Sequence, residues 1–173
     1  MDDLDNKLLV VFNNVNEWLR FAEAKNAMLI AFNGVVFFGV TQMLELPLIR
    51  EYVIFKWYFY ILLLSLAFSV LIALLSFIPR LKQVSPTFNF KKESNFLYFE
   101  CLRHQTPDKI IELYRTGSSE ATDFQIHLAQ QIISNSGVTK RKYDYFTFGT
   151  WLTISGIATI VVAAILFVYN YKK

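Results

Sequence analysis

The chain has 173 residues, of which 54% are hydrophobic, 17% aromatic and only 18% charged. Soluble domains carry about 25% charged residues, so the composition argues against an ordinary soluble domain. The formal net charge of +3 favours no class of partner by itself. The single cysteine, Cys101, excludes a disulfide within the chain. The acidic start, MDDLDNK, lacks the basic segment of a secretory signal, and we expect no cleaved signal peptide.

The N-terminal part predicts one helix that starts in water and continues into lipid. No proline or glycine occurs within residues 2–33, and the charged stretch WLRFAEAK runs directly into an apolar one. Before this junction, apolar residues recur at helical spacing: Leu4, Leu8, Val11, Val15, Trp18 and Ala22. We therefore expect a cytoplasmic amphipathic helix over residues 1–26 that continues into a first membrane span.

Three segments are apolar enough to cross a bilayer, which takes about 20 residues. They are residues 27–44, 53–78 and 146–168. Buried helices of a soluble protein are the weaker alternative, because the remaining polar sequence is too short to cover three of them. Pro47 breaks the link between the first two segments, so residues 27–78 should form a transmembrane hairpin. Residues 146–173 then hold the third span and a short external tail.

The basic residues predict the orientation of these spans. Thirteen of the 17 Lys and Arg residues fall in the N-terminal helix or in residues 79–145, and four fall on the other side. Basic residues accumulate on the cytoplasmic side, so the N-terminus should be cytoplasmic and the C-terminus external. The final YKK weakly opposes this orientation.

Residues 79–145 predict a helical cytoplasmic sensor region. Residues 85–94 have the composition of a linker, and the following NFLYFECLRH is a candidate short helix. Thr106 and Pro107 are a helix-start signal, and Gly117 should end that helix.

A last, long helix follows from residue 120, because no proline occurs between 120 and 171. It should have about fifty residues, with Ser118 or Ser119 as its cap and a bend near Gly137. Its apolar stripe is expected at Phe124, Leu128 and Ile132. The fold class is therefore an all-α membrane protein with three transmembrane helices, of which two extend into a cytoplasmic helical bundle. This geometry suits a ligand-gated membrane protein.

No enzyme motif is present: the sequence has no GxxxxGK[ST] and no GxGxxG after a strand. Cys101 and His104 lie three residues apart but lack the further ligands of a zinc site. No nucleophile, base and orienting group can be proposed together. We therefore predict no catalytic activity, no metal and no other cofactor.

Three motifs resemble the transmembrane effectors of Pycsar phage defence. They are WLRFAEAKNAMLIAFNG (18–34), NFLYFECLR (95–103) and the segment 124–142, in which Gln131-Ile132 precedes a serine and a lysine. The resemblance implies a bacterial inner-membrane protein whose cytoplasmic part binds a nucleotide second messenger and whose membrane part then impairs the membrane. The related Hailong effectors are similar in design, but an oligodeoxynucleotide holds them shut. The ligand is therefore expected to be a cyclic nucleotide or a short oligonucleotide made by a cognate cyclase or nucleotidyltransferase.

Anionic ligands require Arg and Lys, and nucleobases stack on aromatic rings. The candidate ligand-binding residues are Trp18, Arg20, Lys25, Tyr98, Arg103, His104, Lys140, Arg141 and Lys142. Each also has a structural interpretation. The basic run 140–142 is alternatively a topology anchor near lipid headgroups, Arg103 and Trp18 alternatively belong to packed helices, and Arg20 and Lys25 alternatively form ion pairs between helices.

Polar side chains within the spans are candidate pore-lining residues. They are Asn33 in the first span and Ser65, Ser69 and Ser76 in the second. Polar groups in lipid usually face other helices or water, so helix packing is the alternative. Packing is favoured for Gly149 and Gly156, which share a face of the third span with Thr153 and Ala163.

Three spans cannot themselves enclose much of a pore, so a channel would require a homo-oligomer in the lipid bilayer. The leading hypothesis is a nucleotide-gated effector that switches an oligomeric channel or a membrane-disrupting assembly. The alternatives are a non-gated membrane scaffold, a membrane toxin controlled by a partner protein and, less favoured, a transporter subunit.

Overall fold

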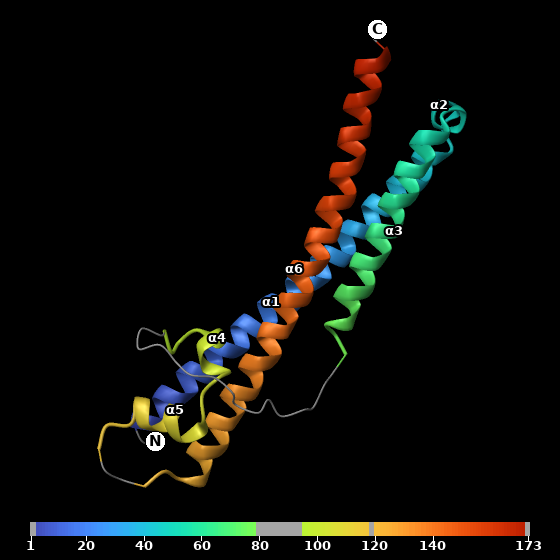
Figure 1. Ribbon diagram of the computed structural model, residues 1–173. Coiled ribbons are helices and arrows are strands. Elements are labelled where there is room, and N and C mark those ends of the chain that lie inside the picture. The colour runs from blue at the N-terminus through green and yellow to red at the C-terminus, as the bar shows by residue number, and fades with distance from the viewer. Residues whose placement is uncertain (1–2, 79–94, 118–119, 172–173) are drawn as a thin grey trace. The chain divides into compact units, whose positions relative to one another are not determined.

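The computed structural model describes residues 3–78, 95–117 and 120–171. These residues form helices and no strands (Figure 1). The helices are α1 (Asp3–Leu44), α2 (Pro47–Glu51), α3 (Val53–Leu75), α4 (Phe99–Leu102), α5 (Pro107–Tyr114) and α6 (Asp123–Tyr171). The all-α class is confirmed. The predicted linker 85–94 and the predicted caps Ser118 and Ser119 lie outside the described residues.

Helices α1, α3 and α6 are each long and apolar enough to cross a membrane, as expected for three spans, while the predicted bounds of the spans stay predictions. With 42 and 49 residues, α1 and α6 are more than twice as long as the about 20 residues that a crossing needs. Both are unbroken helices, as the sequence predicted, and Gly137 lies inside α6 without ending it.

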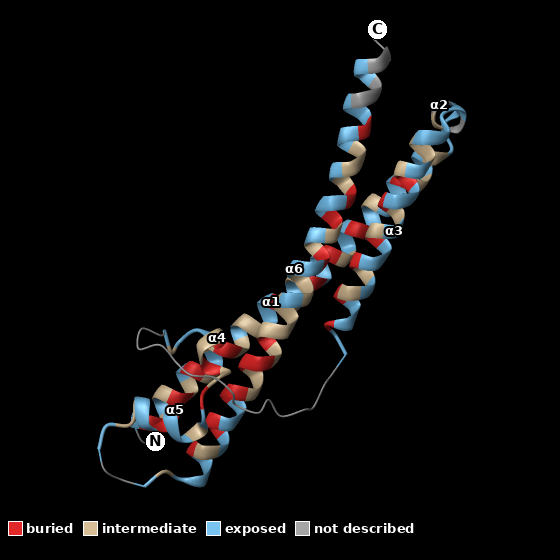
Figure 2. Ribbon diagram, viewed as in Figure 1, coloured by how far each residue is buried: buried red, intermediate tan, exposed pale blue. Residues whose placement is uncertain are grey.

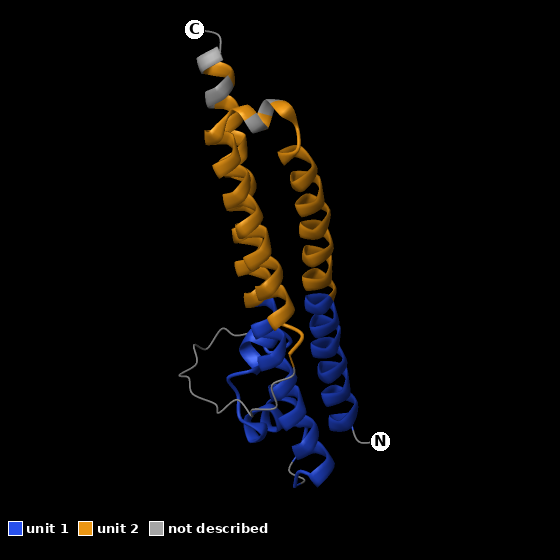
Figure 3. Ribbon diagram, turned by 90° about the vertical axis from the view of Figure 1, so that its right-hand side faces the viewer, with its two compact units in different colours: residues 1–23, 79–143 blue, residues 24–78, 144–173 orange. Residues whose placement is uncertain are grey.

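The chain divides into two compact units (Figure 3). Unit 1 comprises residues 1–23 and 79–143, and unit 2 comprises residues 24–78 and 144–173. Each unit therefore contains one part of α1 and one part of α6, while α4 and α5 belong to unit 1 and α2 and α3 to unit 2.

Unit 1 has an apolar core to which four helices contribute (Figure 2). The predicted stripe of α1 is confirmed at Leu4, Leu8, Val11, Val15 and Ala22, which are buried, whereas Trp18 is half-buried. The cluster joins the first four of these residues to Leu102 of α4, to Ile110 and Ile111 of α5, and to Leu128, Ala129, Ile132 and Ile133 of α6.

The predicted stripe of α6 was wrong at its first position. Phe124 is 54% exposed, and Gln125 takes the buried position instead. The Gln125 amide donates to Asp5 Oδ1 over 2.9 Å, and its carbonyl oxygen accepts from the backbone N–H of Thr122 over 3.1 Å. These hydrogen bonds satisfy a buried polar side chain, so hydrophobicity alone did not identify the inward face at this end of the helix.

Helix ends follow the expected signals with two differences. Pro47 follows the end of α1, as predicted, but it also begins α2, a five-residue helix that the sequence analysis did not include. Thr106 caps α5 by accepting from the backbone N–H of Lys109 over 3.3 Å. That helix ends at Tyr114, before Gly117, whose φ of +127° belongs to the conformational region that glycine alone adopts readily.

Candidate functional site

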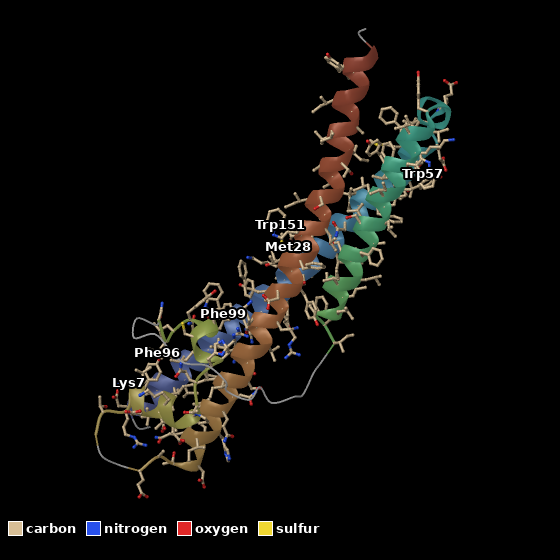
Figure 4. All side chains as sticks on the ribbon, in the orientation of Figure 1. Lys7, Met28, Trp57, Phe96, Phe99 and Trp151 are labelled. Carbon is tan, nitrogen blue, oxygen red and sulfur yellow. The ribbon has the colours of Figure 1, made fainter. Side chains whose placement is uncertain are left out.

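Four aromatic rings gather in unit 1 where α1, α6 and the start of α4 meet. The Trp18 ring of α1 lies 6.2 Å from the Tyr98 ring, 5.9 Å from the Phe99 ring and 6.4 Å from the Tyr143 ring, measured between centroids. Phe99, labelled in Figure 4, stacks on Tyr143 of α6 with an interplanar angle of 7°. We call Trp18, Tyr98, Phe99 and Tyr143 the aromatic cluster.

Two hydrogen bonds hold the chain segment that carries Tyr98 and Phe99. The Asn14 side chain of α1 donates to the carbonyl oxygen of Leu97 over 2.8 Å, and the Tyr114 hydroxyl of α5 donates to the carbonyl oxygen of Phe96 over 3.0 Å. Both partners are backbone atoms beside the cluster, so the position of Tyr98 and Phe99 depends on α1 and α5.

The residues of the aromatic cluster differ in their exposed fraction. Phe99 is 3% exposed, whereas Tyr98 is 41% exposed and offers much of its side chain to a ligand. Burial raises the pKa of Tyr143 above its usual value, and the nearby Tyr98 adds to this effect. Burial likewise raises the pKa of Tyr114. Both phenols are therefore neutral and able to donate hydrogen bonds at physiological pH.

Three of the predicted ligand-binding cations contact other side chains of the protein. Arg103 pairs with Glu100 over 2.7 Å, and Lys142 of α6 pairs with Glu23 of α1 over 2.9 Å, with its side chain 12% exposed. Lys25, which belongs to unit 2, lies 5.3 Å from the centroid of the Phe146 ring. The ion pair between helices is therefore found at Lys142, for which a topology anchor was the alternative, whereas Lys25 contacts an aromatic ring. The ligand-binding role of all three residues stays a prediction.

The other predicted cations are placed differently. Arg20 is exposed, and neither it nor Arg141 has an ion-pair partner within the described part of the chain. Lys140 lies one helical turn before Tyr143, and His104 directly follows Arg103; both are half-buried. The structure therefore brings the rings of Trp18 and Tyr98 into contact. It places Arg103 one helical turn from Phe99, and Lys140 one helical turn from Tyr143.

Two residues of the cluster were missed as site residues. Phe99 was considered only as part of the aromatic run in a candidate short helix, and Tyr143 was not selected as a ligand-binding residue. Tyr143 lies eleven residues after Ile132, or three helical turns, and this spacing was the available signal that it faces α1. Phe99 had no comparable signal, because two of its ring partners, Trp18 and Tyr143, are distant in sequence.

A second polar group lies in unit 2, where α1, α3 and α6 meet. Asn33 and Ser69 are fully buried and Thr153 nearly so. The Asn33 amide donates to Ser69 Oγ over 2.8 Å, and Thr153 Oγ1 lies 2.9 Å from Asn33 Oδ1 and 3.0 Å from Ser69 Oγ. Ser69 Oγ is also 2.7 Å from the carbonyl oxygen of Gly149. We call Asn33, Ser69 and Thr153, with this carbonyl group, the polar clasp.

Close packing accompanies the polar clasp. A Cβ atom at Gly149 would lie 2.9 Å from Leu29 Cδ2, and one at Gly156 would lie 2.9 Å from Leu62 Cδ1. The predicted packing role of both glycines is confirmed by these distances. Ser65 donates to the carbonyl oxygen of Leu152 over 2.7 Å.

The predicted pore-lining residues all lie in unit 2, and Ser76 is also buried. Within one protomer, Asn33, Ser65 and Ser69 bond to neighbouring helices. Their role in lining a pore stays a prediction, and it would require these side chains to exchange partners in an assembly.

The described residues contain no group of three or more His, Cys, Asp or Glu side chains that could hold a metal ion. What the described residues bring together is aromatic faces and cations in unit 1 and hydrogen bonds between helices in unit 2.

The family model of the Pycsar effector protein domain, PycTM, matches residues 7–169. No curated protein and no solved structure gives a significant match. The matched residues include the aromatic cluster, the polar clasp and most of each helix that can cross a membrane. The chain therefore belongs to the Pycsar effector family and is a transmembrane effector of phage defence.

Proposed function

We propose that the chain is a ligand-gated effector in which a cyclic nucleotide or a short oligonucleotide binds unit 1 and switches the membrane-spanning unit 2. The observation that carries this proposal is the aromatic cluster, which combines rings from α1, α6 and the segment between them. A nucleobase of the ligand would stack on the accessible ring of Tyr98 or contact the edge of the Trp18 ring. Stacking on an aromatic side chain contributes about 1–3 kcal/mol per base.

Phosphate recognition would come from cations next to these rings. Arg103 follows Phe99 by four residues and Lys140 precedes Tyr143 by three, so both lie about one helical turn from a ring. A bound phosphate would compete with Glu100 for Arg103, which is 2.7 Å away. Arg20 and Arg141 provide further positive charge on α1 and α6.

The effect of the ligand would pass through the helices themselves. Trp18 and Tyr143 lie on α1 and α6, and each helix continues without a break into an apolar membrane-spanning segment. A ligand shifts an equilibrium only by binding one state more tightly than the other. In this proposal the two states differ in the packing of Trp18 against Tyr98 and Tyr143.

Three further features belong to the proposal. The N-terminus and unit 1 face the cytoplasm of a bacterium, because twelve of the 17 Lys and Arg residues belong to unit 1 and basic residues accumulate on the cytoplasmic side. The membrane is the inner membrane. The active species is a homo-oligomer, either a channel or a membrane-disrupting assembly, because three spans enclose little space.

The experiment is ligand binding and dye leakage with the purified full-length chain in vesicles. The probes are cyclic mononucleotides and oligodeoxynucleotides of two to six bases, a range of about one short binding site. An activating cyclic nucleotide would start leakage, whereas a restraining oligonucleotide would stop leakage that occurs without it. If neither class binds and leakage is constant, the gated function is wrong.

Two matched pairs of variants locate the site. Tyr98→Ala should weaken binding about tenfold or more, and the neighbouring Leu97→Ala, which removes a side chain that is 50% exposed, should not. Arg103→Gln should weaken binding, whereas Lys109→Gln, in the exposed pair with Glu112, should not. Equal effects within both pairs would place the ligand elsewhere on unit 1.

A non-gated scaffold or a partner-controlled toxin is the second candidate. It is favoured by the ion pairs of Arg103 with Glu100 and of Lys142 with Glu23, which already neutralise two predicted ligand-binding cations. Under this alternative, Arg103→Gln would lower the stability of unit 1 without changing any nucleotide binding.

A further inference from the structure

Unit 2 contains an apolar cleft of about 230 Å³ between α3 and the C-terminal part of α6. Tyr52, Phe55 and Phe59 line one side, and Ala163, Ala164 and Val168 line the other. The two alanines leave room opposite the aromatic rings. An apolar cavity of about 150 Å³ is large enough to bind benzene, so this cleft can hold a longer apolar group.

The cleft lies on membrane-spanning helices, and its surroundings in a membrane are therefore acyl chains. Trp57 of α3 is 65% exposed and is labelled in Figure 4. The ring of Tyr60 lies 6.3 Å from it, edge to face. Exposed Trp and Tyr residues at the start of a span mark the depth of the lipid headgroups. One end of the cleft is thus close to the headgroup region.

Lys56 supplies a charge at the same place. It follows Tyr52 by four residues and precedes Phe59 by three, so it lies on the face of α3 that borders the cleft. It is half-buried, and the described residues provide no carboxylate partner for it. Side chains of a helix point toward its N-terminus, which directs this ammonium group to the headgroup level.

We propose that the cleft binds one acyl chain of a phospholipid and that Lys56 binds the phosphate of the same lipid. The apolar lining selects a hydrocarbon chain, and the lysine selects an anionic group at one end of it. A phospholipid has both an acyl chain and an anionic phosphate, and the membrane holds the phosphate at the headgroup level and the acyl chain below it. This site goes beyond the proposed function, since it uses no residue of the aromatic cluster.

The site also links lipid binding to the position of α6. One wall comes from residues between 49 and 59, in α2, α3 and their junction, and the other from α6, so a change in the separation of the walls changes the space for the acyl chain. A lipid that fills the cleft therefore stabilises the arrangement in which the cleft is open.

The test is native mass spectrometry of the full-length chain, purified in mild detergent and mixed with phosphatidylglycerol. Ala164→Phe puts a ring into the cleft from an exposed position of its lining, and Ala158→Phe is its control, since Ala158 is likewise an exposed residue of the same helix but lies outside the lining. We expect one retained lipid per chain in the wild type, about tenfold weaker retention in Ala164→Phe and in Lys56→Gln, and no change in Ala158→Phe. Helical circular dichroism checks that each variant is folded.

Other outcomes would overturn the proposal. One is the absence of a retained lipid in the wild-type chain. Another is equal retention in Ala164→Phe and Ala158→Phe. A third is a loss of self-association in Ala164→Phe with unchanged lipid content, because that result would place a second copy of the chain in the cleft.

Discussion

Both units contain parts of the same two helices and each buries an apolar cluster, but they differ in how polar and apolar side chains are arranged around that cluster. In unit 1 the contact of α1 with its neighbours is apolar, with Leu8 and Val15 fully buried, and polar pairs such as Asn16 with Asn135 lie beside it. In unit 2 the buried polar clasp accompanies an apolar cluster that includes Leu62 and Leu66, and the outward side chains are apolar, as at Phe32 and Val35, which are 52% and 74% exposed.

This difference is the one expected for the proposed placement of unit 1 in water and unit 2 in lipid. Water drives apolar side chains together, so unit 1 is stabilised by its core. In lipid this driving force between helices is absent, and association depends on close packing and hydrogen bonds between helices. The glycines and hydroxyl groups of unit 2 provide both. The comparison predicts that the same type of substitution has different effects in the two units.

The largest expected effect is on the core of unit 1. Leu8→Ala removes a fully buried side chain and should lower the free energy of unfolding by about 2–5 kcal/mol. Leu113→Ala is the control, because Leu113 of α5 is 41% exposed and its truncation should cost far less. Thermal unfolding of the full-length chain in detergent, followed by circular dichroism, measures both. Similar losses would mean that unit 1 has no core of the kind described.

The next prediction compares two exposed valines on α1. Val35→Asp places a carboxylate on the lipid-facing side of unit 2 and should raise the apparent free energy of membrane insertion by about 2.5–3.5 kcal/mol. Val10→Asp makes the same change at a residue of unit 1 that is 64% exposed, and it should change stability by less than about 0.5 kcal/mol. Carbonate extraction of membranes from expressing cells measures the inserted fraction. If Val35→Asp inserts normally, this part of α1 is not in lipid.

The course of both long helices could be predicted from the sequence, because local signals determine it. Periodic apolar residues marked the buried side of α1, and the absence of proline marked the length of α6. The error at Phe124 arose because Gln125 is buried through hydrogen bonds to Asp5 and Thr122, which no hydrophobic pattern reports.

The candidate sites were less predictable, because their contacts join distant segments. The sequence indicated that Asn33 needs a partner in lipid but not that Ser69 and Thr153 provide it. Likewise, Trp18 and Tyr98 were selected by residue type, whereas their contacts with Tyr143 and Phe99 depend on how α4 and α6 pack against α1.

A smaller effect is expected from the glycines of unit 2. Gly149→Leu introduces a Cβ atom 2.9 Å from Leu29 Cδ2 and 3.3 Å from Ser69 Oγ, and overpacking of this kind costs about 1–3 kcal/mol. Gly39→Leu is the matched control, because a Cβ atom there has no neighbour within 4 Å. Unfolding in a gradient of sodium dodecyl sulfate compares the two variants. Equal midpoints would exclude close helix contact at Gly149.

The smallest expected effect is the coupling within the polar clasp. A double-mutant cycle of Asn33→Ala with Thr153→Val should give about 0.6 kcal/mol and at most about 1.7 kcal/mol, the range for hydrogen bonds between membrane helices. The control cycle pairs Asn33→Ala with Ser155→Ala, because Ser155 is exposed and bonds to the carbonyl oxygen of Trp151 in its own helix. Its coupling should be close to zero. A large coupling in the control would show that Asn33 acts on the whole of α6 rather than through its bond to Thr153. A zero coupling with Thr153 would mean that close packing at the glycines, and not the clasp, holds the three helices together.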